Sequence, residues 1–201
     1  MSDYIPYEMW KPLTLEAAVM LFQKAPFRWF VAGGYAVEQF LGTSIRAHDD
    51  IDIAVFRDEQ ITVQEWLNSW QLYAADPPGT LRRWETGEYL AEGIHDIWGH
   101  RFGADAWQLQ LMLVEVNGDE WYSRFDPAVR EKREALIANY HGLPCTRIDV
   151  QLLYKSRHHR PKDDQDFYAA LPHLSVDAKR WLNENIRRLR PDGHDWLAAL
   201  S

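Results

Sequence analysis

The sequence lacks the features that are typical of proteins from oxidising compartments and of membrane proteins. Among its 201 residues there is a single cysteine, Cys145, so no disulfide can form within the chain. No uninterrupted apolar run approaches the roughly 18 residues that a membrane-spanning helix needs. Residues 1–4 also lack the basic and apolar segments that are typical of a secretory signal. We therefore expect a cytoplasmic protein without a membrane partner.

Positive charge is also scarce. The chain has 22 Lys and Arg against 30 Asp and Glu, which gives a formal net charge of -8. Nucleic acid is therefore disfavoured as a partner, because phosphate contacts need a basic surface. An acidic protein suits a cationic partner, or a metal ion held between the protein and an anionic substrate.

The pattern of polar and apolar residues divides the chain into two parts. Residues 1–120 alternate between helix-like and strand-like segments, whereas residues 121–201 consist mainly of helix-like segments separated by prolines. We therefore predict an α/β (α+β) fold, with a mixed β-sheet flanked by helices in the first part and a mainly helical second part packed on it. The ten tryptophans are best explained as core residues, because aromatic side chains bury large areas. An aromatic ligand cage is the less favoured alternative.

Two neighbouring segments carry residues that suit phosphoryl chemistry. Gly33-Gly34 follows a short strand-like run and begins a helix-like segment, where backbone N–H groups can hold phosphate oxygens. Residues 50–56 alternate as a strand does, so Asp50 and Asp52 are expected on one side of it. Carboxylates about 6.5 Å apart along a strand repel each other unless a cation lies between them, and Mg²⁺ takes such oxygen ligands. The combination predicts metal-assisted phosphoryl transfer.

These residues resemble a known signature. Gly33-Gly34 with Asp50-x-Asp52 is similar to the motif of the DNA polymerase β-type nucleotidyltransferase superfamily, and the fuller string AGGYAVEQFLGTSIRAHDDIDIAVF resembles its aminoglycoside adenylyltransferase branch. The resemblance implies a nucleotidyltransferase-like fold, ATP as substrate and Mg²⁺ bound by Asp50 and Asp52 as catalytic ligands. The implied reaction moves AMP from ATP to a hydroxyl of a small, aminoglycoside-like acceptor and releases pyrophosphate.

The resemblance also implies a third carboxylate, which acts as a general base or completes the metal site. The strand expected to carry it has Gln108 and Gln110 at its central positions, and an amide cannot take a proton from a hydroxyl. Glu115 is the nearest acid and our first candidate for the catalytic base. Strand alternation places it on the face opposite Gln110 unless a bulge intervenes. Asp96 is the second candidate, and the absence of a working base is the third alternative.

Basic residues near and beyond the motif are candidates for nucleotide binding. Arg46, which precedes the acidic pair, is predicted to contact a phosphate, the alternative being an ion pair with Asp49 or Asp50. Lys155 ends an apolar helix-like stretch and is predicted to neutralise the triphosphate, although a solvated lysine on a helix is the commoner situation. Arg124 is a weaker candidate for contact with phosphate or acceptor.

Two other functional classes stay open. The glutamines on the central strand suit a catalytically degenerate nucleotidyltransferase fold that binds a nucleotide or a partner without turnover. The basic residues of the C-terminal helices leave room for a toxin–antitoxin type nucleotidyltransferase that modifies RNA or protein. The sequence predicts no particular oligomeric state.

Overall fold

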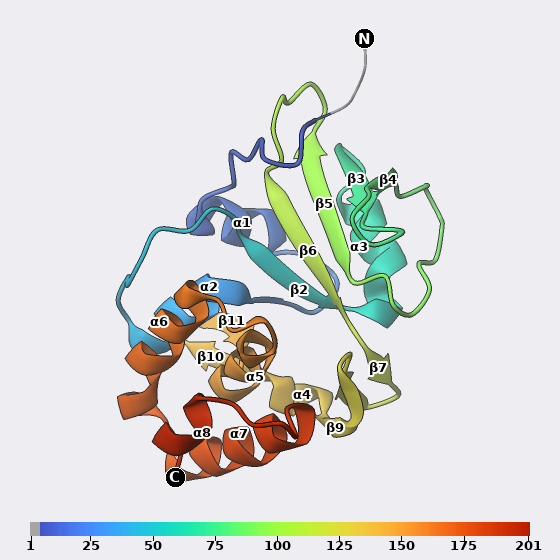
Figure 1. The fold of residues 1–201 in the computed structure, drawn as a ribbon. Coiled ribbons are helices and arrows are strands. Elements are labelled where there is room, and N and C mark those ends of the chain that lie inside the picture. Colours follow the sequence, from blue (N-terminus) through green and yellow to red (C-terminus); the bar gives the residue numbers. More distant parts are fainter. Residues whose placement is uncertain (1–4) are drawn as a thin grey trace. The chain divides into compact units, whose positions relative to one another are not determined.

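The structure, a computed structural model, describes residues 5–201 (Figure 1). The expectation about a secretory signal in residues 1–4 lies outside the described residues. The chain forms two compact units that are interleaved along the sequence: the first contains the residues up to Phe30 and His48–Asn117, and the second contains Val31–Ala47 and Gly118–Ser201. The prediction had two consecutive parts instead, at residues 1–120 and 121–201.

The first unit is built around a twisted run of five strands in the order β2-β6-β5-β3-β4. Strands β2 and β6 are parallel, and the other neighbours are antiparallel, so the run is mixed. Helices α1 and α3 cover one face of it (Figure 1). The elements are α1 (Leu15–Phe22), β2 (Asp52–Phe56), the 3₁₀ turn η1 (Arg57–Glu59), α3 (Gln60–Trp66), β3 (Trp70–Ala74), β4 (Arg82–Arg83), β5 (Asp96–Arg101), β6 (Leu109–Val114) and β7 (Val116–Asn117).

The two faces of this run differ because side chains alternate along each strand. Leu72, Ile97 and Leu111 are buried on the face that the helices cover. The opposite face carries half-buried side chains, among them Asp52, Gln110, Trp98 and Tyr73, and is called the Asp52 face below. Asp52, Gln110 and Asp96 therefore lie on the face of the strands opposite to that of Leu72, Ile97 and Leu111.

The second unit combines short strands with helices. Val31 at the end of β1 (Trp29–Val31) pairs in parallel with Cys145, and the strand pairs β10–β11 and β8–β9 are antiparallel. Helices α2, α5 and α6 pack against one another, and α7 packs on α5. The elements are α2 (Gly33–Leu41), β8 (Glu120–Ser123), β9 (Asp126–Lys132), α4 (Arg133–Leu136), β10 (Ile137–Tyr140), β11 (Leu143–Thr146), α5 (Ile148–His158), α6 (Pro161–Ala170), η2 (Leu171–His173), α7 (Val176–Leu189) and α8 (Trp196–Ala199).

The predicted mixed α+β fold with C-terminal helices is confirmed. The sequence did not predict the four short strands β8–β11, which precede those helices. Five tryptophans lie in the core: Trp70, Trp84, Trp107, Trp121 and Trp196. The other five are half-buried instead: Trp10, Trp29, Trp66, Trp98 and Trp181. None of the helices in residues 5–201 has the length and apolarity to cross a bilayer.

Candidate active site

The Asp-x-Asp motif lies at the start of the parallel strand pair. Asp52 is the first residue of β2, and Ile51 before it is fully buried. The N–H of Gln110 donates to the Ile51 carbonyl at 3.2 Å, so the ladder between β2 and β6 extends back to a point between the two aspartates. Asp50 and Asp52 are both half-buried on either side of this anchored isoleucine.

A row of paired residues crosses the Asp52 face at the level of Asp52. Asp52 lies opposite Gln110, Gln110 lies opposite Trp98, and Trp98 lies opposite Tyr73. Asp96 is two residues from Trp98 on the same strand and therefore projects to the same face. Gln110 Nε2 donates to Asp96 Oδ1 at 3.3 Å. An acid was expected on β6 at this position. The residue there is Gln110, and its side-chain amide contacts the carboxylate of Asp96 on the neighbouring strand β5.

Glu115, the first candidate for the base, occupies a different environment. Its carboxylate is 4% exposed and accepts two hydrogen bonds from Arg57, at 2.5 Å from Nε and 2.6 Å from Nη2. The same guanidinium also donates to the carbonyls of Leu90, Ala91 and Ile94. Through Arg57, this ion pair connects the ends of β2 and β6 to the loop that leads into β5. The contacts of Glu115 therefore stabilise the fold.

The Gly-Gly sequence begins α2 in the second unit. Gly33 has a φ of 65°, a left-handed conformation that favours glycine. Its N–H donates to Gln151 Oε1 at 2.9 Å, and the N-cap residue of the helix makes no side-chain cap hydrogen bond. The N–H groups in the first turn of a helix have no partner within the helix. The Gly33 N–H is satisfied by Gln151, so a phosphate role for this turn would rest on the next N–H, that of Gly34.

Arg46 and Lys155, the two predicted phosphate contacts, share one buried carboxylate of the second unit. Arg46 donates to both oxygens of Asp166, at 2.8 and 2.9 Å, and Lys155 Nζ lies 2.7 Å from Asp166. Lys155 also donates to Asp163 at 3.3 Å, and both aspartates are fully buried. The ion pair of Arg46 is therefore with Asp166 rather than with Asp49 or Asp50, the partners that the sequence offered.

Hydrogen bonds and charges stabilise this buried network. Burial acts to raise the pKa of Asp163, but hydrogen bonds from Arg160 and the charge of Lys155 outweigh it, so the pKa lies below the ordinary value. The hydrogen bond to Asp166 raises the pKa of Arg46 in turn. Glu38 completes the arrangement by accepting hydrogen bonds from the N–H groups of residues 45 and 46, at 2.8 and 3.2 Å. The network fixes the segment after α2 to α5 and α6.

Cys145, the single cysteine, is buried, and Arg124, the weaker candidate for contact with phosphate or acceptor, has aromatic neighbours. Burial raises the pKa of the Cys145 thiol to about 12, which keeps it unreactive. Arg124 lies over the rings of Phe125 and Tyr154, at 5.1 and 6.0 Å from their centroids. Within residues 5–201, no three His, Cys, Asp or Glu side chains converge into a ready metal site.

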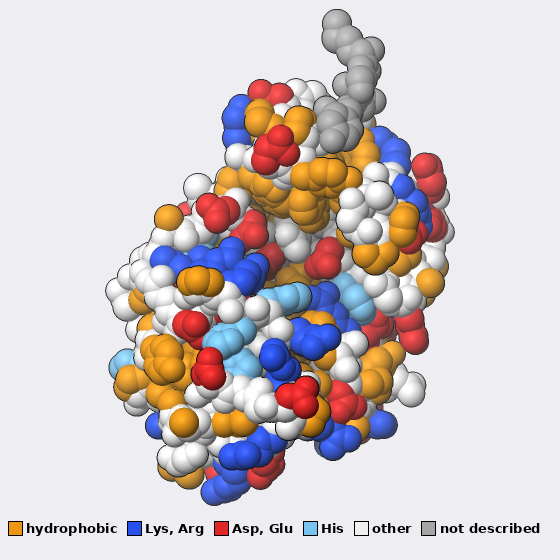
Figure 2. Space-filling view, viewed as in Figure 1, with side chains coloured by type: hydrophobic (Ala, Val, Ile, Leu, Met, Phe, Trp, Pro, Cys, Tyr) orange, Lys and Arg blue, Asp and Glu red, His pale blue; other side chains and the backbone are white. Residues whose placement is uncertain are grey.

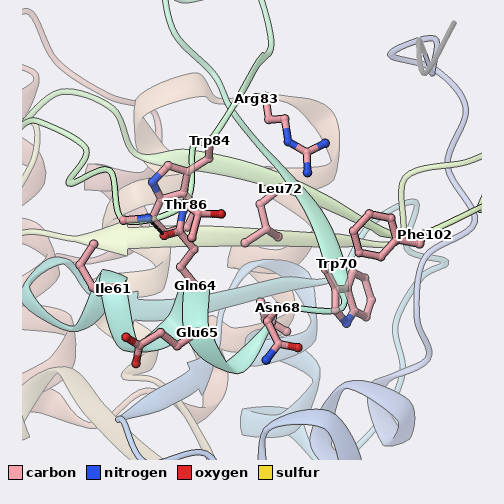
Figure 3. Close-up of a pocket in the computed structure, with 12 residues that line it drawn as sticks. Ile61, Gln64, Glu65, Asn68, Trp70, Leu72, Arg83, Trp84, Thr86 and Phe102 are labelled. Atoms are coloured by element: carbon pink, nitrogen blue, oxygen red, sulfur yellow. Dashed lines mark hydrogen bonds between the residues drawn. The ribbon is translucent and has the colours of Figure 1, made fainter.

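A separate cavity of about 390 Å³ lies in the first unit, among α3, β3 and the segment around β4 (Figure 3). The rings of Trp70 and Phe102 lie near each other at one end of it. Gln64, on its wall, is satisfied within the protein: Nε2 donates to the Glu85 carbonyl at 2.7 Å and Oε1 accepts from the Gly87 N–H at 2.6 Å. The cavity contains none of the predicted site residues, and we assign it no role.

Comparison with known proteins connects these features to one family. The sequence model for aminoglycoside-2''-adenylyltransferase matches residues 14–166. The solution structure of the antibiotic-resistance factor ANT(2'')-Ia is similar with a TM-score of 0.54 at 13% identity, over 87% of this chain and 89% of that one. The crystal structure of the lincosamide antibiotic adenylyltransferase LnuA with lincomycin bound is similar with a TM-score of 0.54 at 17% identity, over 79% and 97%. No curated protein matches the chain.

Proposed function

The chain belongs to the aminoglycoside-2''-adenylyltransferase family, and we propose that it is a nucleotidyltransferase that moves AMP from ATP to a hydroxyl of an aminoglycoside-like small molecule. The observation that carries the proposal is the Asp50-x-Asp52 motif at the start of β2, where Asp52 lies on the face that also bears Gln110 and Asp96. Two acids near each other on one ordered strand end need a cation to offset their repulsion.

Asp50 and Asp52 are the proposed ligands of Mg²⁺. Their carboxylate oxygens are the hard donors that this ion prefers, and a site with two protein carboxylates leaves its other positions to water and phosphate. Both side chains are half-buried beside the fully buried Ile51, so the backbone that carries them is fixed. When bound, the ion offsets negative charge on the phosphates and polarises the one that is attacked.

We assign a nucleotide phosphate to the backbone at Gly33 and Gly34. Gly33 shapes the turn, and the N–H of Gly34 is the proposed donor, because the N–H of Gly33 already donates to Gln151. The positive φ of Gly33 and its hydrogen bond to Gln151 support this role, because together they fix the first turn of α2. Arg46 and Lys155 contribute positive charge to the second unit, and we propose that they assist nucleotide binding through the network with Asp166.

Asp96 is the proposed general base, in preference to Glu115. Asp96 is half-buried on the Asp52 face, and Gln110 orients its carboxylate through the 3.3 Å hydrogen bond. In the reaction, Asp96 takes the proton of the acceptor hydroxyl while the hydroxyl oxygen bonds to the α-phosphorus. The bond from that phosphorus to the bridging oxygen breaks, and pyrophosphate leaves. The buried pair with Arg57 gives Glu115 a structural role in this proposal.

Transfer of label from α-labelled ATP to a panel of aminoglycosides, RNA and proteins tests the function. We expect label on an aminoglycoside, only with Mg²⁺, and we expect D50N and D52N to abolish it without changing the circular dichroism spectrum. D105N is the matched control, because Asp105 is an exposed acid of the same unit paired with Lys11. Label on RNA or protein instead of the small molecules would contradict the assigned acceptor.

The position of Gln110 favours one second candidate, a degenerate fold that binds a nucleotide without turnover. Gln110 lies directly opposite Asp52 at the place where a third acid was expected. This candidate predicts ATP binding by the wild-type protein but no labelled product with any acceptor. The labelled-ATP experiment together with a binding titration separates the two.

A further inference from the structure

The Asp52 face ends in a group of aromatic side chains for which the proposed chemistry has no use. Trp98 lies on β5, and Tyr7 and Trp10 of the N-terminal segment pack against it with ring centroids 5.8 and 4.9 Å away. Both contacts are edge-to-face, at 78° and 70°. We call Tyr7, Trp10 and Trp98 the aromatic wall. Figure 2 shows hydrophobic side chains gathered over the upper parts of β5 and β6 as labelled in Figure 1.

Backbone hydrogen bonds hold this wall in place. The N–H of Trp107 donates to the Met9 carbonyl at 2.8 Å, and the N–H of Lys11 donates back to the Trp107 carbonyl at 2.9 Å. The Trp107 ring is buried behind Trp98, with centroids 5.5 Å apart, and its Nε1 donates to the Pro6 carbonyl. The N-terminal segment is therefore attached to the sheet beside Trp98, so the rings of the wall are preorganised.

The register of the strands fixes where the wall stands relative to the acids. Trp98 lies opposite Gln110, and Gln110 lies opposite Asp52. Neighbouring strands are about 4.8 Å apart, so the backbones at Asp52 and Trp98 are separated by about 10 Å. Asp96 is two residues from Trp98 along β5 and points to the same face. A half-buried indole thus stands beside the proposed base and across from a proposed metal ligand.

We propose that Trp98 determines acceptor specificity by stacking against a ring of a cationic acceptor, with Trp10 as its brace. This inference rests on the proposed function and adds the surface that selects the acceptor. An indole face attracts cations and apolar ring faces, and the Asp96 carboxylate, in a chain of net charge -8, attracts ammonium groups. The chemical class that satisfies both is a ring that carries amines on an otherwise apolar face. A linear polyamine offers ammonium groups but no apolar ring face that could stack on the indole.

The test compares W98A, W98F and the control F102A in acceptor titrations. Phe102 is 59% exposed in the same unit and has no role in the site. For W98A we expect the acceptor KM to rise at least tenfold, with the KM for ATP unchanged and kcat changed less than threefold. W98F, which keeps an aromatic ring, should recover most of the affinity, and F102A should behave as the wild type does.

Calorimetric binding of two cations makes the inference independent of turnover. W98A should bind an aminoglycoside at least tenfold more weakly than the wild type does, while its affinity for spermine, a linear polyamine without a ring, should fall less than threefold. Equal aminoglycoside affinity in W98A and wild type overturns the inference even if transfer is observed. An aminoglycoside that binds through Trp98 without being labelled supports the inference and contradicts the transfer reaction. If the wild-type protein neither binds nor labels any aminoglycoside, both proposals are wrong.

Discussion

Five acids of this protein fall into two groups that the sequence does not distinguish. Asp50, Asp52 and Asp96 are half-buried in the first unit, and Asp52 and Asp96 lie on the same face of its sheet. Glu115 and Asp166 are buried and bound by arginine or lysine. A buried carboxylate with a cation at hydrogen-bond distance is part of the scaffold, because removing either partner leaves an uncompensated charge. Half-buried acids gathered on one face are the ones that a metal or substrate can use.

Among the substitutions that test this division of the acids, we expect the largest effect, a loss of transfer rate, from a change at Asp96. D96N removes the proposed base while its amide oxygen can still accept the hydrogen bond from Gln110. We expect the transfer rate to fall about 10²- to 10⁴-fold and the free energy of unfolding to stay within about 0.5 kcal/mol of the wild type. Steady-state kinetics and urea unfolding measure the two quantities. A rate that stays within threefold of the wild type would place the base elsewhere.

At Glu115 we expect the opposite result, which is a loss of stability with little change in the transfer rate. E115Q leaves the Arg57 charge buried without its carboxylate, so the protein should lose about 3–5 kcal/mol of stability. The transfer rate per folded molecule should change less than threefold, and its pH profile should keep its shape. Measurements at a temperature where the variant is folded separate the two effects. An altered pH profile with unchanged stability would restore Glu115 as the base.

A smaller loss of stability is expected at Asp166. D166N weakens the pairing of Arg46 and Lys155, but Lys155 keeps Asp163 and Arg46 keeps the Ala47 carbonyl. We therefore expect a loss of about 3 kcal/mol, at the lower end of the range for broken buried pairs. Urea unfolding measures it, with D177N as the control at an exposed acid of the same unit. Wild-type stability in D166N would show that the network is dispensable.

The smallest expected effect is on the pH dependence of the free energy of unfolding. Burial and the charge of His159 lower the pKa of His194 in the folded protein, so the unfolded chain takes up a proton on this residue more readily. Stability from His194 is complete above the ordinary pKa of about 6.5 and declines as the pH falls below it. Thermal unfolding between pH 7 and pH 5.5 should show this decline, and H194N should flatten it. An identical slope in the variant would assign the decline to other groups.

The Gly-Gly and Asp-x-Asp segments could be predicted because the patterns that specify them lie within a few consecutive residues. The alternation around Ile51 and Ile53 predicted the strand that carries Asp52, and Gly33-Gly34 predicted the start of α2. These features depend on backbone preferences and on the period of apolar residues. The comparison with the family model agrees with them, since its match spans both segments.

The partners of the charged residues could not be predicted, because they come from distant parts of the chain. Arg46 and Asp166 are 120 positions apart, and Arg57 and Glu115 are 58 apart. The contact between Gln110 and Asp96 depends on the register of β5 against β6, which no local pattern specifies. Strand alternation predicted that Glu115 lies on the face opposite Gln110, but nothing in the sequence predicted that Arg57 binds its carboxylate.

Mg²⁺-dependent binding of ATP, compared between the wild-type protein and D52N, tests the central claim most directly. Asp52 begins β2 opposite Gln110 and is one of two proposed ligands for the ion. We predict that calorimetry shows ATP binding to the wild-type protein that strengthens at least tenfold when Mg²⁺ is added. D52N should lose this gain while keeping the unfolding midpoint of the wild type. An equal gain in D52N, or no gain in the wild type, would contradict the account.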